Sequence, residues 1–123
     1  MKVLLAEDDL DQLAVRCMLL ERSGFAALGA SDDVSALSLA KIEKPECAVV
    51  DLRLPTEERG LRLICALKEI DPLIRIIVLT GSNAEHVVQR PEAKLVDEIV
   101  VKGASSARLV EKLKLLASRA TAL

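Results

Sequence analysis

The chain has 123 residues and a formal net charge of −2 at pH 7, which is enough for one domain that buries roughly two thirds of its unfolded surface. Its basic residues are scattered among acids, so the charge gives no reason to expect direct binding of nucleic acid, which needs concentrated Lys and Arg. Phe25 is the only aromatic residue, which argues against a surface on which nucleotide bases stack.

The N-terminus and the apolar runs predict neither export nor a membrane partner. The sequence starts without a basic segment followed by a long apolar stretch, as an export signal would have. Every apolar run is shorter than the ~20 residues needed to cross a bilayer. The three cysteines, Cys17, Cys47 and Cys65, are at no metal-ligand spacing, and we expect them to be reduced and mostly buried. These features predict a cytoplasmic protein.

Short apolar runs alternate with helical patterns along the chain. The runs cover residues 2–6, 25–30, 47–50, 75–79 and 98–101, and runs of this kind predict buried strands of a parallel sheet. Helical patterns follow at residues 10–23, between a Ser-Asp-Asp cap at 31–33 and Pro45, at 61–70, at 83–89 and at 105–120. The fourth of these is short and should end before Pro91. Because helices that connect parallel strands cross over with one handedness, the pattern predicts an α/β fold with helices on both faces of the sheet. We expect a single domain over residues 1–123.

Several positions should fix the helix ends and the helix faces. Asp9 is placed to cap the first helix, and Gly24 follows where a left-handed terminator is expected. Leu10 in the first helix and Ile70 in the third belong to apolar patterns at three- and four-residue spacing and are expected to face the core. The polar residues 57–60 are expected to form a solvated loop, in which Gly60 permits a tight entry into the third helix.

Four acidic or polar groups lie directly after short apolar runs. Glu7 and Asp8 follow the first run, Asp51 the third, Thr80 the fourth and Lys102 the fifth. Because ligands bind at the carboxyl ends of the strands in parallel α/β sheets, we expect these side chains to meet at one edge.

Three carboxylates close together need a cation, since two of them 4 Å apart repel by about 4 kcal/mol at an effective dielectric near 20. A hard divalent ion suits a site made of oxygen ligands, and Mg²⁺ prefers one or two carboxylates with water and phosphate oxygens. The alternative is that Asp8 and Asp9 cap a helix and Asp51 is a surface residue, which explains one acid and not the others.

A carboxylate beside a cation is also a nucleophile for phosphorus, so Asp51 is a candidate to form an aspartyl-phosphate. The Lys102 ammonium would reach a phosphate oxygen or hold Asp51 before reaction, and the Thr80 hydroxyl would donate to the same phosphate. Simpler interpretations remain open. Thr80 would be a residue at a strand end that forms a hydrogen bond with the adjacent turn, and Lys102 would be a solvated surface lysine.

At this point the chain resembles the receiver domains of two-component response regulators. The resemblance covers nearly the whole length and rests on four segments: residues 4–9 (Leu-Leu-Ala-Glu-Asp-Asp), 51–55 (Asp-Leu-Arg-Leu-Pro), 79–81 (Leu-Thr-Gly) and Lys102. It implies the flavodoxin-like fold, with five parallel strands in the order 2-1-3-4-5. It also implies that the domain is no enzyme beyond phosphoryl transfer to itself and slow autodephosphorylation.

The resemblance assigns a role to each residue. Asp51 would accept a phosphoryl group from a histidine kinase or a histidine phosphotransfer protein in a phosphorelay. Asp8, Asp51 and the backbone carbonyl of Arg53 would bind Mg²⁺, and Glu7 would act on the ion through water. Thr80 would swing toward the phosphate while Lys102 pairs with it. The side chains of Arg53 and Ser82 occupy positions that modulate the phosphate lifetime.

Two positions depart from the pattern of this family. Ile99 stands where an aromatic residue usually rotates with the threonine, and Gly103 stands where proline usually follows the lysine. Both departures concern the usual output surface rather than the phosphorylation chemistry. His86, the only histidine, is expected to be an ordinary surface residue.

Two alternatives to a phosphorylated switch or carrier stay open, and a third, a phosphatase, lacks a required residue. One is a receiver fold that serves only as an interaction module with little or no phosphorylation. Another is the receiver part of a larger regulator with a separate output domain. A Mg²⁺-dependent phosphatase with an aspartyl nucleophile needs a second acid two residues further on, and this chain has Arg53 there.

Overall fold

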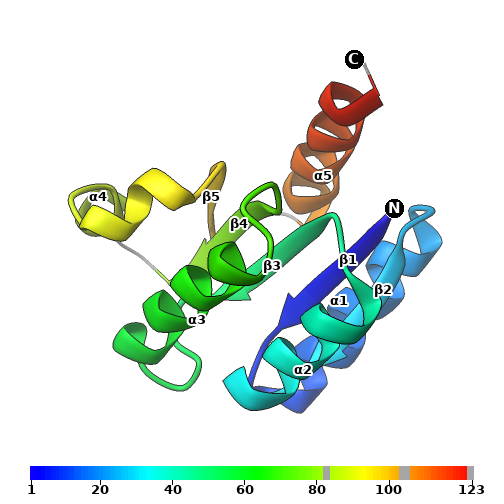
Figure 1. Cartoon of the computed structure of the whole chain (residues 1–123). Helices are drawn as coiled ribbons and strands as arrows, with labels where there is room; N and C mark the ends of the chain where they lie inside the picture. The colour runs from blue at the N-terminus through cyan, green and yellow to red at the C-terminus, as the bar shows by residue number, and fades with distance from the viewer. Residues whose placement is uncertain (82–83, 103–105, 122–123) are drawn as a thin grey trace.

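The computed structural model describes residues 1–81, 84–102 and 106–121. It contains one sheet of five parallel strands in the order β2-β1-β3-β4-β5, which confirms the predicted fold (Figure 1). The strands are β1 (Lys2–Ala6), β2 (Ala26–Ala30), β3 (Cys47–Asp51), β4 (Arg75–Thr80) and β5 (Glu98–Val101). The helices are α1 (Leu10–Arg22), α2 (Asp33–Glu43), α3 (Glu57–Ile70), α4 (Ala84–Val88) and α5 (Ser106–Thr121), with a 3-10 helix η1 (Pro91–Leu95) before β5.

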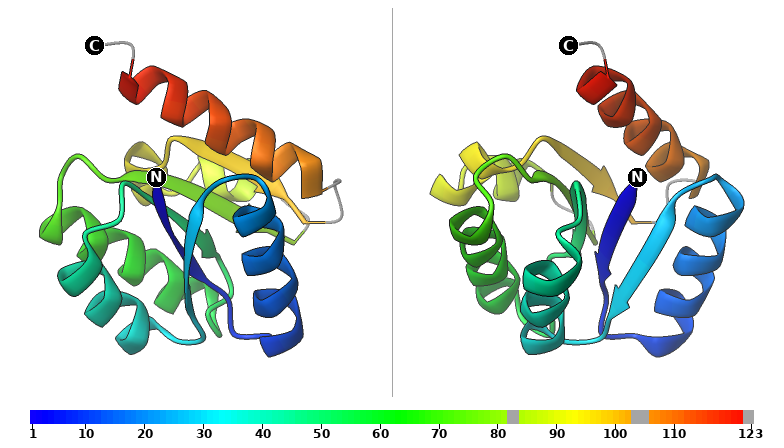
Figure 2. Two further views of the ribbon diagram at one scale, coloured as in Figure 1. Left: turned by 90° about the vertical axis from the view of Figure 1, so that its right-hand side faces the viewer. Right: turned by 45° about the vertical axis from the view of Figure 1, so that its right-hand side comes forward.

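The helices cover both faces of the sheet, as Figure 2 shows for α1 and α5 on one side and α2 and α3 on the other. Successive residues of β1 alternate between two cores. Val3 and Leu5 pack with residues of α1 and α5, whereas Leu4 and Ala6 pack with residues of α2 and α3. Burial on both faces explains why the strands are continuous apolar runs rather than alternating ones.

Helix α3 begins at Glu57, four residues earlier than the sequence predicts. Thr56 caps it by accepting a hydrogen bond from the Arg59 N–H at 3.3 Å, and the acids in its first turn suit the positive end of the helix dipole. Gly60 therefore lies inside the first turn and not in an entry loop. A Cβ atom at Gly60 would lie 2.1 Å from the backbone oxygen of Leu52, so glycine permits a close backbone approach here.

Other expectations on individual residues have mixed outcomes. Asp9 caps α1, and Gly24 adopts a φ of +94° after the helix, both as predicted. Leu10 and Ile70 are exposed by 68% and 37%, so the prediction that they face the core is wrong. Each is the terminal residue of its helix, where fewer neighbours cover a side chain.

The cysteines are free thiols, as expected. Cys47 is buried in β3, but Cys17 and Cys65 are only half-buried, so the expectation of burial holds for one of the three. Helix α4 ends at Val88, before Pro91, and Pro91 opens η1, where its missing N–H costs no hydrogen bond. Among the described residues, no helix is both long and apolar enough to cross a membrane.

Candidate functional site

Three acids meet where β1 and β3 end. Glu7 and Asp8 directly follow β1, Asp51 is the last residue of β3, and the two strands are hydrogen-bonded neighbours. One carboxylate oxygen from each of the three acids lies within 4.8 Å of the other two. The structure therefore brings together the acids that the sequence singled out. Asp51 and Glu7 are buried, while Asp8 is exposed.

Asp51 is held on both of its carboxylate oxygens. Oδ1 accepts a hydrogen bond from the backbone N–H of Arg53 at 3.1 Å, and Oδ2 accepts one from the Lys102 ammonium. Only 3% of the Asp51 side chain is exposed. These two donors give the buried carboxylate a fixed orientation, as a nucleophile requires.

Lys102 reaches Asp51 because β5 lies beside β4. Its backbone N–H donates to the Thr80 carbonyl at 2.6 Å, which fixes the lysine at the carboxyl end of the sheet. Thr80 is the last residue of β4, is 6% exposed, and pairs with Val101 in the strand register. Asp51 pairs with Leu79, the residue before Thr80. The threonine and the lysine thus lie at the same edge as the acids, and Lys102 is not a solvated surface residue.

Glu7 is the most enclosed acid of the site, with 1% of its side chain exposed. Its Oε1 lies 3.7 Å from Lys102 Nζ, and its Oε2 accepts the Asp9 N–H at 3.3 Å. Burial raises the pKa of Glu7 to about 7. A hydrogen bond and charge repulsion with Asp51 also raise it, against the lowering by the Asp9 N–H and the Lys102 charge.

Arg16 of α1 is a member of this site that sequence reasoning missed. Its guanidinium donates a hydrogen bond to Glu7 Oε1, and 18% of its side chain is exposed. Its position in the sequence could have indicated this. Arg16 lies three residues after Leu13 and one before Cys17, and both of these pack against the core between α1 and the sheet. A cation at an inward position of a helix that follows two acids indicates an ion pair.

The remaining residues of interest are placed as follows. Arg53 is exposed, and its backbone N–H donates to Asp51 Oδ1. Ile99, in place of the usual aromatic residue, is half-buried and packs on the core shared by α2 and α3. Ser82 and Gly103 lie outside the described residues. His86 is on α4 with 52% of its side chain exposed and lies 3.2 Å from Glu57.

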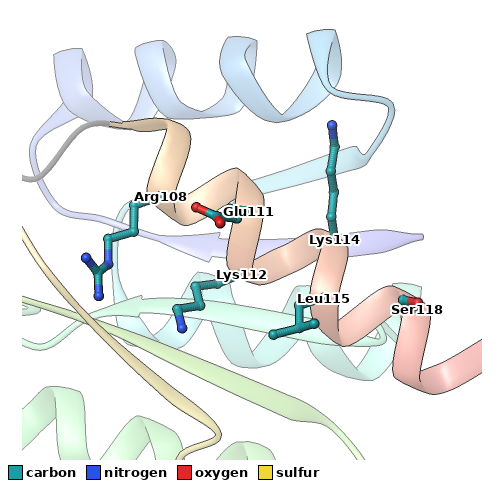
Figure 3. A pocket seen from close by; sticks show the side chains of 6 residues that line it. All are labelled: Arg108, Glu111, Lys112, Lys114, Leu115 and Ser118. Atoms are coloured by element: carbon teal, nitrogen blue, oxygen red, sulfur yellow. The ribbon is translucent and has the colours of Figure 1, made fainter.

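The donor set fits a hard divalent cation. All three acids offer oxygen, the Asp8 carboxylate is exposed to incoming ions, and two carboxylates are fixed by donors. This is the chemistry that Mg²⁺ prefers. A broad hollow of about 530 Å³ lies elsewhere, along α5, where Arg108, Lys112 and Leu115 line it (Figure 3). It shares no lining residue with the acidic site.

Comparisons with known proteins agree with this geometry. The sequence model of the "Response regulator receiver domain" family matches residues 3–114. The transcriptional regulatory protein PrrA of Mycobacterium tuberculosis is 33% identical over 119 residues, which are 96% of this chain and 50% of PrrA. The sporulation initiation phosphotransferase F of Bacillus subtilis is 26% identical over 91 residues, 72% of this chain and 70% of that protein.

Solved structures show the same fold. A response regulator protein from Burkholderia pseudomallei, solved with a phosphorylated aspartic acid, a calcium ion and citrate, aligns with a TM-score of 0.80 and 33% identity over 98% of this chain and 71% of that one. The receiver domain of a Francisella response regulator aligns with a TM-score of 0.85 and 24% identity, over 97% of this chain and 98% of that one.

The chain spans about half the length of the PrrA proteins that it matches, so it corresponds to one part of those regulators. The family match covers most of the chain, and the fold and the acidic site agree with it. A receiver domain of this kind is not a classical enzyme. The chain belongs to the response regulator receiver domain family.

Proposed function

We propose that this domain is a phosphoacceptor in a two-component or phosphorelay system and that Asp51 is the residue phosphorylated. The observation that carries the proposal is the placement of Asp51: a buried carboxylate at the end of β3, bonded to Lys102 and beside two further acids. The Burkholderia pseudomallei relative, which contains a phosphorylated aspartic acid, supports it.

In the proposed reaction, a carboxylate oxygen of Asp51 attacks the phosphorus of a phosphohistidine on the donor protein. The new P–O bond forms as the P–N bond breaks, and its electron pair leaves with the imidazole nitrogen. Phosphoryl transfer of this type depends mainly on positioning and on neutralising charge. Lys102 and the backbone N–H of Arg53 hold the nucleophile, and the Thr80 hydroxyl would donate to the transferred group.

Mg²⁺ is the proposed cofactor, held by Asp8, Asp51 and the backbone carbonyl of Arg53, with Glu7 acting through water. Support comes from the three carboxylate oxygens within 4.8 Å. When bound, the ion would neutralise negative charge on the phosphoryl oxygens. In its absence, Lys102 and Arg16 partly neutralise the same carboxylates.

The proposed phosphodonor is a histidine kinase or a histidine phosphotransfer protein. Helix α1 offers a surface for it beside the acids, because three apolar side chains there point outward: Leu10, Val15 and Met18 are exposed by 68%, 62% and 54%. Such side chains beside the acids would offer apolar contact area to a docked protein. The kinship with a sporulation phosphotransferase supports a relay partner.

Phosphorylation would either switch the domain between two conformations or make it a carrier that passes the phosphoryl group on. It adds about two negative charges and strong acceptor oxygens at Asp51, which would draw Thr80 and Lys102 inward. A second candidate, an interaction module with little phosphorylation, is favoured by one observation: Ile99 replaces the aromatic residue expected to move with Thr80. Since the PrrA proteins are twice as long, a separate output domain is also part of the proposal.

Intact mass spectrometry after incubation with Mg²⁺ and acetyl phosphate tests the proposal. We expect a single addition of ~80 Da, corresponding to one phosphoryl group, and no addition in the Asp51→Asn variant. Asp71→Asn, which changes an acid at the end of α3, is the matched control and should react like the wild type. An unmodified wild-type protein that still binds Mg²⁺ would support the interaction module instead.

A further inference from the structure

The acidic site faces two cations rather than one. Arg16 donates from its guanidinium to Glu7 Oε1, and Lys102 Nζ lies 3.7 Å from the same oxygen. The contact with Arg16 is enclosed, because 18% of the arginine side chain and 1% of the glutamate side chain are exposed. Arg16 comes from the middle of α1, which contacts β2 and β1, whereas Lys102 follows β5 at the other end of the strand order.

The arginine changes the charge that an incoming metal ion meets. Glu7, Asp8 and Asp51 carry three negative charges when ionised, and Arg16 and Lys102 carry two positive charges, so the site keeps one net negative charge. Without Arg16 it would keep two. Since the attraction for a divalent ion depends on the charges within a few ångströms, this difference bears directly on affinity.

We propose that Arg16 is a resident cation of the site, which fixes the Glu7 carboxylate and competes with Mg²⁺ for it. The inference rests on the proposed function, because it concerns the same metal site. Arg16 is a positioning residue that acts through Glu7. It compensates a buried carboxylate while the metal is absent, because a buried charge without a partner is strongly unfavourable. It also lowers the metal affinity, so the site fills at higher Mg²⁺ concentration than its three acids alone would require.

The competition can be measured directly by calorimetric titration of Mg²⁺ into the full chain. All titrations are run at the same pH and ionic strength, since salt screens the attraction between the site and the ion. Arg16→Gln removes the charge and keeps much of the side-chain volume, and we expect Mg²⁺ to bind it about tenfold more tightly. Arg16→Lys keeps the charge and should stay within about twofold of the wild type.

The matched control is Arg22→Gln, which removes the same charge from the exposed last turn of the same helix. It should leave the Mg²⁺ affinity unchanged, because Arg22 is not one of the cations that contact the site. Arg16→Met serves as a second neutral variant if Arg16→Gln does not fold. A neutral Arg16 variant that binds Mg²⁺ no more tightly than the wild type overturns the inference.

Thermal unfolding supplies a second readout that needs no phosphorylation. In the presence of a chelator, Arg16→Gln should melt below the wild type, and added Mg²⁺ should raise its melting temperature by more than it raises that of the wild type. An equal gain in both proteins contradicts the competition. A wild-type protein that binds no Mg²⁺ contradicts the proposed function as well, whereas wild-type binding with an unchanged Arg16→Gln affinity contradicts this inference alone.

Discussion

The Lys102 ammonium donates a hydrogen bond to Asp51 Oδ2, although the two residues are 51 positions apart in the chain. The sheet makes this contact possible, because β3, β4 and β5 are consecutive neighbours and end at the same edge. The contact neutralises a carboxylate that is 3% exposed. It also places a cation where the oxygens of a phosphoryl group on Asp51 would lie.

Replacing Lys102 should therefore weaken both stability and phosphorylation. We expect Lys102→Met to lower the free energy of unfolding without Mg²⁺ by about 1–2 kcal/mol, less than for a fully buried pair because the lysine is partly exposed. Urea unfolding in the presence of a chelator measures this free energy of unfolding. Lys114→Met, on the exposed face of α5, is the control. Equal stability of the two variants would show that the ion pair contributes little to the fold.

Asp51→Asn should abolish detectable Mg²⁺ binding. The change removes one of three clustered carboxylates and replaces it with a neutral group, whereas the metal needs charged oxygen ligands. The Mg²⁺ affinity is measured from amide chemical shifts in a titration followed by NMR. Asp11→Asn changes an exposed acid in the first turn of α1 and should titrate like the wild type. Retention of wild-type affinity by Asp51→Asn would place the metal elsewhere.

Gly60→Ala tests the close approach between α3 and the loop after β3. The added Cβ would lie 2.1 Å from the Leu52 backbone oxygen, so the backbone must shift, and we expect a loss of about 2–3 kcal/mol in the free energy of unfolding. Gly81→Ala is the control, since its Cβ would meet no atom within 4 Å among the described residues. A Gly60→Ala protein as stable as Gly81→Ala would contradict the packing described for this turn.

Cys47 should give the stability a dependence on alkaline pH. Burial raises the pKa of its thiol from 9.0 to about 12. In that interval the unfolded chain releases a proton that the folded chain retains, so the unfolded state gains stability as pH rises from 9.0 toward 12. Below that interval Cys47 adds no pH dependence.

The measurement is the free energy of unfolding as a function of pH for the wild type and for Cys47→Ala, which should lose less stability over the alkaline range. The same burial predicts that a thiol reagent at neutral pH modifies Cys47 only after unfolding. Rapid modification of Cys47 in the native protein, or identical alkaline profiles for the two proteins, would contradict the assigned environment.

The sequence was sufficient to predict the sheet and the residues at its carboxyl edge. Strands buried on both faces are continuous apolar runs, and the polar residue after each run marks the edge. This logic predicted that Glu7, Asp8, Asp51, Thr80 and Lys102 would meet, and the structure brings them together.

The exceptions have physical reasons. The start of α3 was missed because residues 57–60 contain no apolar side chain to give helical spacing and include a glycine, although the two glutamates and the arginine are good helix formers. The Thr56 cap and the close packing of Gly60 on Leu52 decide the boundary. Arg16 was missed because a charged residue in an amphipathic helix usually faces water, and its place beside Leu13 and Cys17 in the helix was not weighed.

The most direct test of the account is to locate the phosphoryl group on the chain. The protein is incubated with Mg²⁺ and acetyl phosphate, treated with borohydride to reduce any aspartyl-phosphate to homoserine, and digested for peptide mass spectrometry. We predict homoserine at position 51 and at no other acid, with none in the Asp51→Asn variant. Reduction at Asp8 or at another carboxylate, with residue 51 intact, would contradict the assignment of Asp51 as the phosphoacceptor.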